Sequence, residues 1–279
     1  MPYLCTHLAF GDRVARKRGA SIETQQDAYL LGCFGPDVFF FDRLPPPIGV
    51  PNQKKHGNAL HALDASVLFA ALQAHATDAL RPYLCGFLTH IALDSTLHPY
   101  VEARHTGLDH TRFEGVIDAI VYAETKDRVP YETLLKRRAK TDAIDKLLAD
   151  ASLDLTGRDV RGAYQRSYRK FRRLMPFLFD KKGRRYRTLN GMERLLKQDG
   201  LLSAFLLAAP REDAEDSMNL SRSVWAAPWA PERVRDESVP MLMEQAEALA
   251  LALIDALEAN DTETLTRLLQ NRTMQKGAL

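Results

Sequence analysis

The chain has 279 residues, of which 46% are hydrophobic, and its formal net charge is +2. This length and apolar content suffice for a sizeable core, in one large domain or two small ones. The near-neutral charge indicates no particular partner for the whole chain, and no apolar run reaches the roughly 18 residues that predict a membrane-spanning helix.

The N-terminus, MPYLCTHLAFGDRVARKRG, places no basic segment ahead of an apolar core, so we do not expect a secretory signal. The three cysteines, Cys5, Cys33 and Cys85, are an odd and sparse set that indicates reduced thiols rather than a disulfide framework. For Cys5 and Cys33, small buried side chains are favoured over soft metal ligands. We therefore expect a cytoplasmic protein.

Apolar residues recur at helical spacing along nearly the whole chain. Ser21 is a candidate N-cap for SIETQQDAYLLGCF, and further helices are predicted over 59–76, 83–98, 108–126, 130–149 and 238–259. The main breaks are GPD (35–37), the Pro-rich DRLPPPIGVPNQKKHG (42–57) and AAPWAPE (226–232). No stretch alternates convincingly as a strand would, so the sequence predicts an all-α protein.

The stretch YLCGFLTHIALDSTLHPYVEA (83–103) is as apolar as a buried helix, yet it carries His90, Asp94 and His98 at intervals of four residues. This spacing places His90 and Asp94 on one helix face. Pro99 disfavours helical geometry at the preceding residue, so we expect His98 at the helix end. A buried carboxylate is unfavourable unless it is paired or bound to metal, so the pair predicts two metal ligands within one turn.

The next predicted helix repeats the pattern, because LDHTRFEGVID places His110 and Glu114 four residues apart and Asp118 four residues further on. Imidazole and carboxylate together suit zinc best, with manganese or iron as alternatives. A satisfied polar network would be the simpler interpretation of a lone histidine. The repeated spacing on two helices instead favours a metal site with several ions.

All eight histidines lie at or before residue 110, so any histidine chemistry belongs to the N-terminal part. Three further ligand candidates are His7 in THLAFGD, Asp37 in GPD and His56 in KKHGNALH, each at a helix edge or beside a break. His61 and His75 have many apolar neighbours in the sequence, and we expect them at the surface or the edge of the core rather than as ligands.

Taken in order, these motifs resemble the zinc-dependent phospholipase C family, relatives of the S1/P1-type nucleases. The resemblance rests on THLAF, GCFGPDVFFFD, a histidine after the following loop, GFLTHIALDSTLHPYV and HTRFEGVID, and it covers about residues 1–125. A weaker similarity lies in NLSRSVWAAPWAPE (219–232). The resemblance implies a multi-helix phospholipase C/P1 nuclease-like bundle around a buried site with several metal ions.

The resemblance also implies two or three zinc ions. The residues that match the ligands of the first ion are Asp37, His56, His90 and Asp94, and those that match the second are His98, His110 and Glu114. A third ion would share Asp94 with His7 and with the N-terminal amine and carbonyl of a processed chain. This sequence begins Met1-Pro2, so removal of Met1 would expose the amine of Pro2.

Such a zinc cluster implies hydrolysis of a phosphodiester by activated water, with phospholipids as the substrate class. Asp37 is the candidate catalytic residue, which would hold a zinc and orient or deprotonate the water. Asp118 is expected to accept a hydrogen bond from a ligand histidine. Phe39, Phe40 and Phe41 are candidates for an apolar substrate wall, although core packing after a turn explains them at least as well.

Residues 161–187 hold 11 Lys or Arg against one acid, Asp180, a local net charge of +10 that leaves −8 on the rest of the chain. The segment is a candidate for contact with a membrane through anionic lipid headgroups, and less so for contact with nucleic acid. The alternative is a solvated helix face, with the apolar side chains packed inward. Those side chains are Tyr164, Tyr168, Phe171, Leu174 and Phe177.

Two other functions stay open from the sequence: a nuclease or other phosphoesterase on the same scaffold, and a non-catalytic helical metal-binding protein. Helical phosphohydrolases of the HD type use an adjacent His-Asp pair, and the chain has only the reversed Asp109-His110. We expect residues 1–150 to form the metal-binding catalytic core. Residues 151–279 would form a helical extension packed on it within one structural domain.

Overall fold

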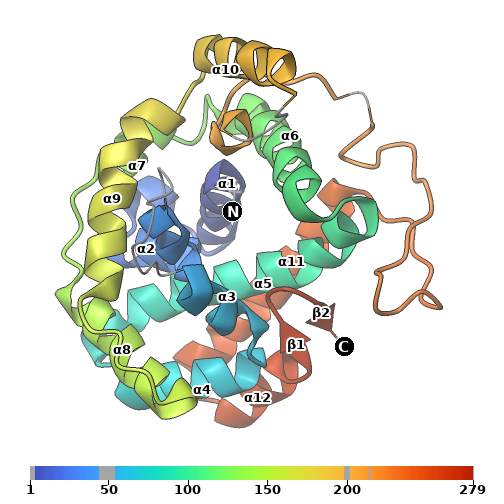
Figure 1. Ribbon diagram of the computed structural model, residues 1–279. Coiled ribbons are helices and arrows are strands. Elements are labelled where there is room, and N and C mark those ends of the chain that lie inside the picture. Colours follow the sequence, from blue (N-terminus) through green and yellow to red (C-terminus); the bar gives the residue numbers. More distant parts are fainter. Residues whose placement is uncertain (1–3, 44–53, 198–201, 214, 279) are drawn as a thin grey trace.

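The computed structural model describes residues 4–43, 54–197, 202–213 and 215–278. Over these residues the chain is helical, as predicted, apart from irregular connections and one short hairpin near the C-terminus (Figure 1). The α-helices are α1 (Leu4–Lys17), α2 (Asp27–Phe34), α3 (Lys54–Ala62), α4 (Ala65–His75), α5 (Arg81–Arg104), α6 (Gly107–Thr125), α7 (Tyr131–Lys136), α8 (Asp142–Thr156), α9 (Ala163–Leu178), α10 (Arg184–Leu195), α11 (Val239–Glu258) and α12 (Thr262–Leu269). The short 3-10 helices are η1 (Ile22–Thr24), η2 (Gly35–Arg43), η3 (Asp78–Leu80) and η4 (Ser203–Phe205), and β1 (Arg272–Thr273) pairs antiparallel with β2 (Gly277–Ala278).

Helix α5 is the central element of the fold, and it is buried almost without interruption from Tyr83 to Val101. Helices α2 and α11 pack along it, and α1 and α6 add further contacts. The closest approach is made by two glycines, since a Cβ on Gly86 would collide with the Tyr29 carbonyl oxygen and one on Gly32 with the Tyr83 carbonyl oxygen. The backbones of α2 and α5 therefore touch directly, which only glycine allows.

The predicted end of the central helix at His98 is wrong, because α5 continues through Pro99 to Arg104. A proline inside a helix has no N–H to donate, so the carbonyl of Ser95 loses its helical partner. The C-terminal hairpin covers this carbonyl, as a Cβ on Gly277 would collide with the Ser95 oxygen. Tertiary packing thus supports the helix past the proline, and His98 stays in line with Asp94.

Three other predicted helices differ in their boundaries. Ser21 precedes the short η1, and α2 begins only at Asp27. The predicted helix over 59–76 is divided between α3 and α4, because Asp64 caps α4 by accepting from the Ser66 N–H at 2.9 Å. The predicted helix over 130–149 is divided between α7 and α8. The GPD break opens η2, and residues 44–53 of the Pro-rich loop lie outside the described residues.

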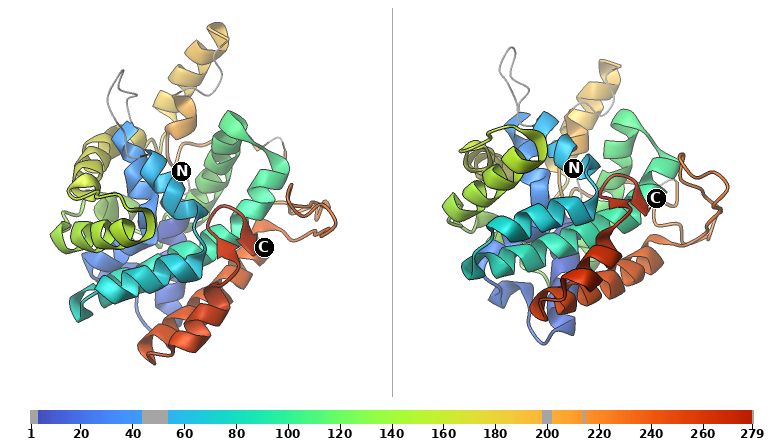
Figure 2. Two further views of the ribbon diagram at one scale, coloured as in Figure 1. Left: turned by 60° about the horizontal axis from the view of Figure 1, so that its bottom comes forward. Right: turned by 90° about the horizontal axis from the view of Figure 1, so that it is seen from below.

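The basic segment of the sequence forms α9 and the first part of α10. Tyr164, Tyr168 and Phe171 are buried, as expected for a helix whose apolar side packs inward, and α9 lies against η2. Phe177 departs from that expectation because its side chain is 51% exposed. Helix α10 projects from the body of the molecule (Figures 1 and 2). The proposed boundary at residue 150 stays a prediction, although α9 and α11 both pack on N-terminal elements.

Within the part of the chain that the structure describes, no helix combines the length and the apolar character needed to cross a bilayer. The longest, α5, carries His90 and Asp94 in its middle.

We expect Gly86→Ala to lower the free energy of unfolding by about 1–3 kcal/mol, because the added methyl group would collide with the Tyr29 carbonyl of α2. Gly191 is a matched control inside α10, since nothing lies within 4 Å of the equivalent position. Gly191→Ala should raise stability by about 0.5–1 kcal/mol through helix propensity. Chemical denaturation of both variants measures the difference, and an unchanged midpoint for Gly86→Ala would contradict the direct contact of α2 with α5.

Candidate metal centre

Polar side chains from five elements meet in the interior beside α5. They come from α1, the start of η2, the end of α3, the middle of α5 and the start of α6. Three groups of side chains could each hold a metal ion, because the candidate ligand atoms within a group all lie within 4.8 Å of one another. The groups are His7, His90 and Asp94; Asp37, His61 and His90; and His98, His110 and Glu114.

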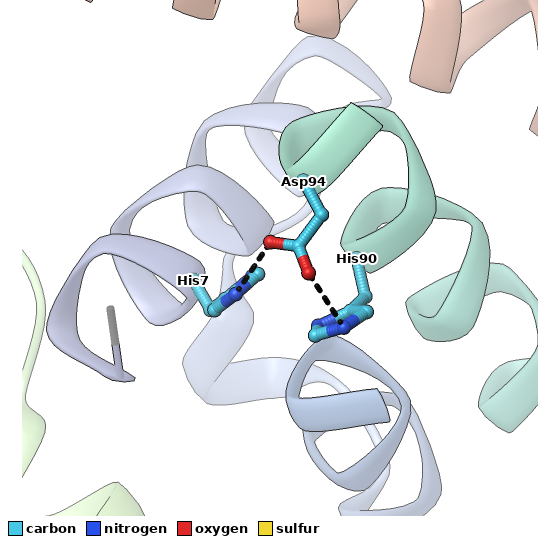
Figure 3. A group of neighbouring side chains, drawn as sticks. All are labelled: His7, His90 and Asp94. Carbon is cyan, nitrogen blue, oxygen red and sulfur yellow. Dashed lines mark ion pairs between the residues drawn. The ribbon is translucent and has the colours of Figure 1, made fainter. Parts of the chain in front are cut away.

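Asp94 is the centre of the first group (Figure 3). Its Oδ1 lies 3.2 Å from His7 Nε2, and its Oδ2 lies 3.2 Å from His90 Nε2. The rings of His7 and His90 stack with their centroids 4.3 Å apart. The same carboxylate is 3.7 Å from His61 Nε2 and 4.0 Å from His98 Nδ1, so four imidazoles surround one buried acid.

Asp37 and His61 complete the second group. Asp37 Oδ1 lies 3.1 Å from His61 Nε2, and its Oδ2 lies 3.9 Å from His7 Nε2. Gly35 makes this approach of η2 feasible, because its φ is +51° and a Cβ there would collide with the His90 ring. The glycine two residues before Asp37 thus lets the chain pass directly over a histidine of α5.

The third group joins α5 to α6. His110 Nε2 lies 2.7 Å from Glu114 Oε1, within one turn of α6. His98 Nε2 reaches the same oxygen at 3.5 Å from α5. On the other side of its ring, His110 Nδ1 lies 3.1 Å from Glu102 Oε1. The four-residue spacings of the sequence therefore place His98, His110 and Glu114 together, as the resemblance implied.

Three of these histidines are held in the same way by the backbone. His61 Nδ1 lies 2.8 Å from the Gly57 carbonyl oxygen, His90 Nδ1 lies 3.1 Å from that of Cys33, and His98 Nδ1 bonds the carbonyl of Met274. A carbonyl only accepts, so each Nδ1 must carry the proton. In the neutral ring, Nε2 then presents a lone pair toward a carboxylate oxygen, which is also an acceptor.

Two acceptors facing each other in the interior repel unless a proton or a metal ion lies between them. Histidines that bind metal have this orientation, with the outer nitrogen donating to a carbonyl and the inner one directed at the ion. Imidazole nitrogens and carboxylate oxygens are also the donors that zinc prefers when thiolates are absent. The residues of this interior therefore fit zinc in chemistry and in tautomer.

The pKa shifts in the centre indicate that its buried carboxylates require positive charge beside them. Burial lowers the pKa of His98, but the nearby Asp94 and Glu114 carboxylates outweigh it and raise the pKa to about 9. Burial likewise opposes ionisation of Asp94, yet His90, His98 and His7 hold its pKa well below the usual value. The carboxylate is thus stable only with cationic partners around it.

His56 does not lie with the other predicted ligands. Its Nε2 is 3.1 Å from Ser152 Oγ of α8, and its ring stands edge-on to Phe39. Burial, together with the charge of Arg158, lowers its pKa to about 4. His56 and His61 are five residues apart on α3, so their directions differ by about 140° around the helix axis. The two side chains therefore face different sides of the helix. The structure therefore brings His61, and not His56, to Asp37.

The expectation that His61 lies at the surface or the core edge is wrong, since it is 4% exposed and faces two carboxylates. Two histidines follow the Pro-rich loop, and the sequence does not fix which one faces the core. His75 agrees with its expectation, because it is partly exposed and pairs with Asp154 at 2.6 Å. In the sequence, the apolar neighbour Leu60 is the indication that His61 faces the core.

Asp118 does not accept a hydrogen bond from a histidine within the described residues. It accepts from the Thr6 N–H at 2.8 Å and from Thr6 Oγ1 at 3.0 Å, and burial raises its pKa to about 6. The predicted role of Asp118, accepting a hydrogen bond from a ligand histidine, is therefore corrected. Asp118 instead anchors α1 at Thr6, one residue before His7. Asp118 positions that histidine through the backbone rather than through the ring.

The aromatic run after Asp37 is mostly core. Phe39 and Phe41 are fully buried and pack edge-on against Tyr164 and Phe171 of α9, so they do not form a substrate wall. Phe40 is partly exposed, and its ring centroid lies 5.3 Å from that of His61. Only Phe40 of the three remains a candidate for contact with a substrate.

The described cysteines stay outside the three ligand groups. Cys5 and Cys33 are buried free thiols, as expected for small core residues, and burial raises the pKa of Cys33 to about 12. A thiol this hard to ionise is a poor metal ligand. The N-terminal amine that the resemblance proposed for a third ion lies outside the described residues.

A protein-family model described as zinc-dependent phospholipase C matches residues 6–163, which is more than half of the chain. The match begins one residue before His7 and ends at the first residue of α9, so it contains all three ligand groups. No curated protein and no solved structure matches the chain significantly.

The pair His61 and His56 offers a test of the ligand assignment. We expect His61→Gln to weaken zinc binding by at least about tenfold. Removing a residue that only hydrogen-bonds a metal ligand already weakens binding by about that factor, and His61 is proposed as a ligand itself. His56→Gln is the matched control on the same helix, because it faces Ser152 instead of Asp37. Metal content after dialysis measures both, and a loss of zinc in His56→Gln alone would restore the original assignment.

Proposed function

The chain belongs to the zinc-dependent phospholipase C family, and on that premise we propose that it is a zinc-dependent hydrolase of phosphodiesters with phospholipids as its substrate class. One observation supports this most. Carbonyls fix the Nδ1 atoms of His61, His90 and His98, so that three Nε2 atoms point at buried carboxylates. Histidines that bind metal are commonly held in this way, with the outer nitrogen donating to a carbonyl and the inner one directed at the ion.

Two zinc positions, and part of a third, are proposed with their ligands. Asp37, His61 and His90 with Asp94 would hold one ion, and His98, His110 and Glu114 would hold a second. His7 with Asp94 and His90 would contribute to a third. Bound zinc would supply a Lewis acid that makes water more acidic and neutralises the negative charge that develops on phosphoryl oxygens.

Asp37 is proposed as the catalytic residue because it is the least enclosed of the inner carboxylates. Its side chain is 11% exposed, against 3% for Asp94. Burial raises the pKa of Asp37, but its interactions with His61 and His90 outweigh burial and lower the pKa. A carboxylate with a low pKa is a weak base, so Asp37 would mainly accept a hydrogen bond from the attacking water and orient it.

Asp94 is proposed to have a different task. One of its oxygens faces His7 and the other faces His90, and it lies deeper than Asp37. A carboxylate shared in this way suits a bridge between ligand groups rather than contact with a substrate. The division of roles between the two acids follows from their burial.

We expect Asp37→Asn to lower kcat by about 10²–10⁴-fold while most zinc stays bound, because the amide keeps one ligand oxygen but replaces the other, which would accept the hydrogen bond from the water, with an NH2 donor. Asp154→Asn is the matched control, since that carboxylate also faces a histidine, His75, but at the surface. Initial rates on bis-p-nitrophenyl phosphate, with metal content measured in parallel, check both. Equal activity of Asp37→Asn and wild type would exclude this role for Asp37.

A substrate screen separates the proposed function from its alternatives. The screen compares phosphatidylcholine, single-stranded DNA and bis-p-nitrophenyl phosphate. Cleavage of DNA without phosphatidylcholine would decide for a nuclease on the same scaffold. No turnover of any of the three by zinc-loaded protein would decide for a non-catalytic metal-binding protein.

We further expect chelation to abolish turnover and to lower the midpoint of thermal unfolding, because the inner carboxylates would lose the cations that face them. Zinc should restore activity and magnesium should not, as imidazole ligands favour zinc over the oxygen-preferring magnesium. Full activity in protein shown to be free of metal would contradict the proposed reaction. Restoration by magnesium alone would contradict the assignment of zinc.

A further inference from the structure

The exposed charge of α9 and α10 is entirely positive over residues 163–197. The two acids of this range, Asp180 and Glu193, are buried and serve the backbone and a neighbouring hydroxyl. Asp180 accepts from the Tyr186 N–H at 2.9 Å, and Glu193 accepts from Ser203 Oγ at 2.6 Å. Exposed cations on or directly after α10 are Arg184, Arg185, Arg187, Arg194 and Lys197.

Large apolar side chains are exposed among these cations. Met192, Leu195 and Leu196 of α10 and its end are 54%, 86% and 69% exposed, and Phe177 at the end of α9 is 51% exposed. The spacing of residues 192, 195 and 196 places all three on one helix face. Apolar side chains grouped on one exposed face of a protein indicate a contact surface.

The exposed Phe177 contacts the cationic start of α10. The Arg185 guanidinium lies 5.3 Å from the Phe177 ring centroid, and its Nη1 donates to the Phe177 carbonyl at 3.0 Å. Helix α10 projects from the molecule, so this surface is not recessed (Figure 2). We call residues Phe177, Arg184, Arg187, Met192, Leu195 and Leu196 the α10 surface.

We propose that the α10 surface docks on the headgroup region of an anionic phospholipid bilayer. An interfacial helix combines Leu with Lys or Arg in this manner, so that apolar side chains enter the boundary while cations meet anionic lipid. This deepens the proposed function, on which it rests for the choice of phospholipid, because it names the surface that brings the enzyme to its substrate.

Other occupants fit the surface less well. A second copy of the chain would bring two cationic faces together, which electrostatic repulsion opposes. Single-stranded nucleic acid would use the cations, but it is bound by stacking on aromatic rings rather than by exposed Met and Leu. The mixture of exposed Leu195 and Leu196 with arginines therefore favours lipid.

The test is co-sedimentation of the full chain with vesicles of equimolar phosphatidylcholine and phosphatidylserine, and with vesicles of phosphatidylcholine alone. We expect binding to the anionic vesicles that weakens as salt is added. The double variants Arg184→Ala/Arg187→Ala and Leu195→Ser/Leu196→Ser should each bind at least about tenfold more weakly. All four side chains are exposed, so neither change removes a core contact.

Matched controls lie elsewhere on the molecule. Arg267→Ala/Lys276→Ala removes two exposed cations from α12 and the C-terminal hairpin, and Leu220→Ser/Val224→Ser removes two exposed apolar side chains from the segment before α11. Both should bind anionic vesicles like the wild type. If the controls and the α10 variants weaken binding equally, or if the anionic vesicles are not bound, the proposal is overturned. Binding of single-stranded DNA without vesicle binding would overturn it in favour of nucleic acid.

Hydrolysis of soluble bis-p-nitrophenyl phosphate, measured on the same samples, separates this inference from the proposed function. All four double variants should retain wild-type rates, since none touches the ligand groups. Vesicle binding without hydrolysis of any substrate would leave the docking surface standing and reject the enzyme. Hydrolysis without vesicle binding would support the proposed enzyme and reject the docking surface.

Discussion

The carboxylate of Asp94 imposes the main constraint on this fold, because an ionised acid is held at 3% exposure among four imidazoles. A charge this deep destabilises the folded state unless cations compensate it. Helix α5 must be buried to carry it, and the glycine contact with α2 brings the Cys33 carbonyl to His90. The packing of α2 against α5 therefore both forms part of the core and positions His90 in the site.

The C-terminal part contributes to the centre although none of its described residues belongs to the three candidate ligand groups. It has no histidine, yet the Met274 carbonyl fixes Nδ1 of His98, and the same hairpin covers the Ser95 carbonyl that Pro99 leaves without a helical partner. One short hairpin thus supports both the helix and the tautomer of its last candidate ligand. The C-terminal hairpin is therefore in direct contact with the helix that carries His98.

The sequence predicted what depends on helix period and missed what depends on contacts between elements. His90 with Asp94, and His110 with Glu114, were predictable because four residues return a side chain to the same face of any helix. The orientation of α3 is not predictable in this way, since its direction relative to α5 depends on tertiary packing, and His56 rests on the resemblance alone. Pro99 was misjudged for the same reason, as its effect was decided by a hairpin about 170 residues away.

Charge separation connects the interior to the α10 surface. The net charge of +2 conceals a segment of +10 within a remainder of −8, and a uniform distribution would give an anionic membrane no preferred face. Because the exposed charge of 163–197 is entirely positive while the remainder is acidic, an anionic surface would attract α10 and repel the rest of the molecule. This distribution would therefore orient the protein on a bilayer, and the exposed Leu195 and Leu196 would add an attraction that salt does not screen.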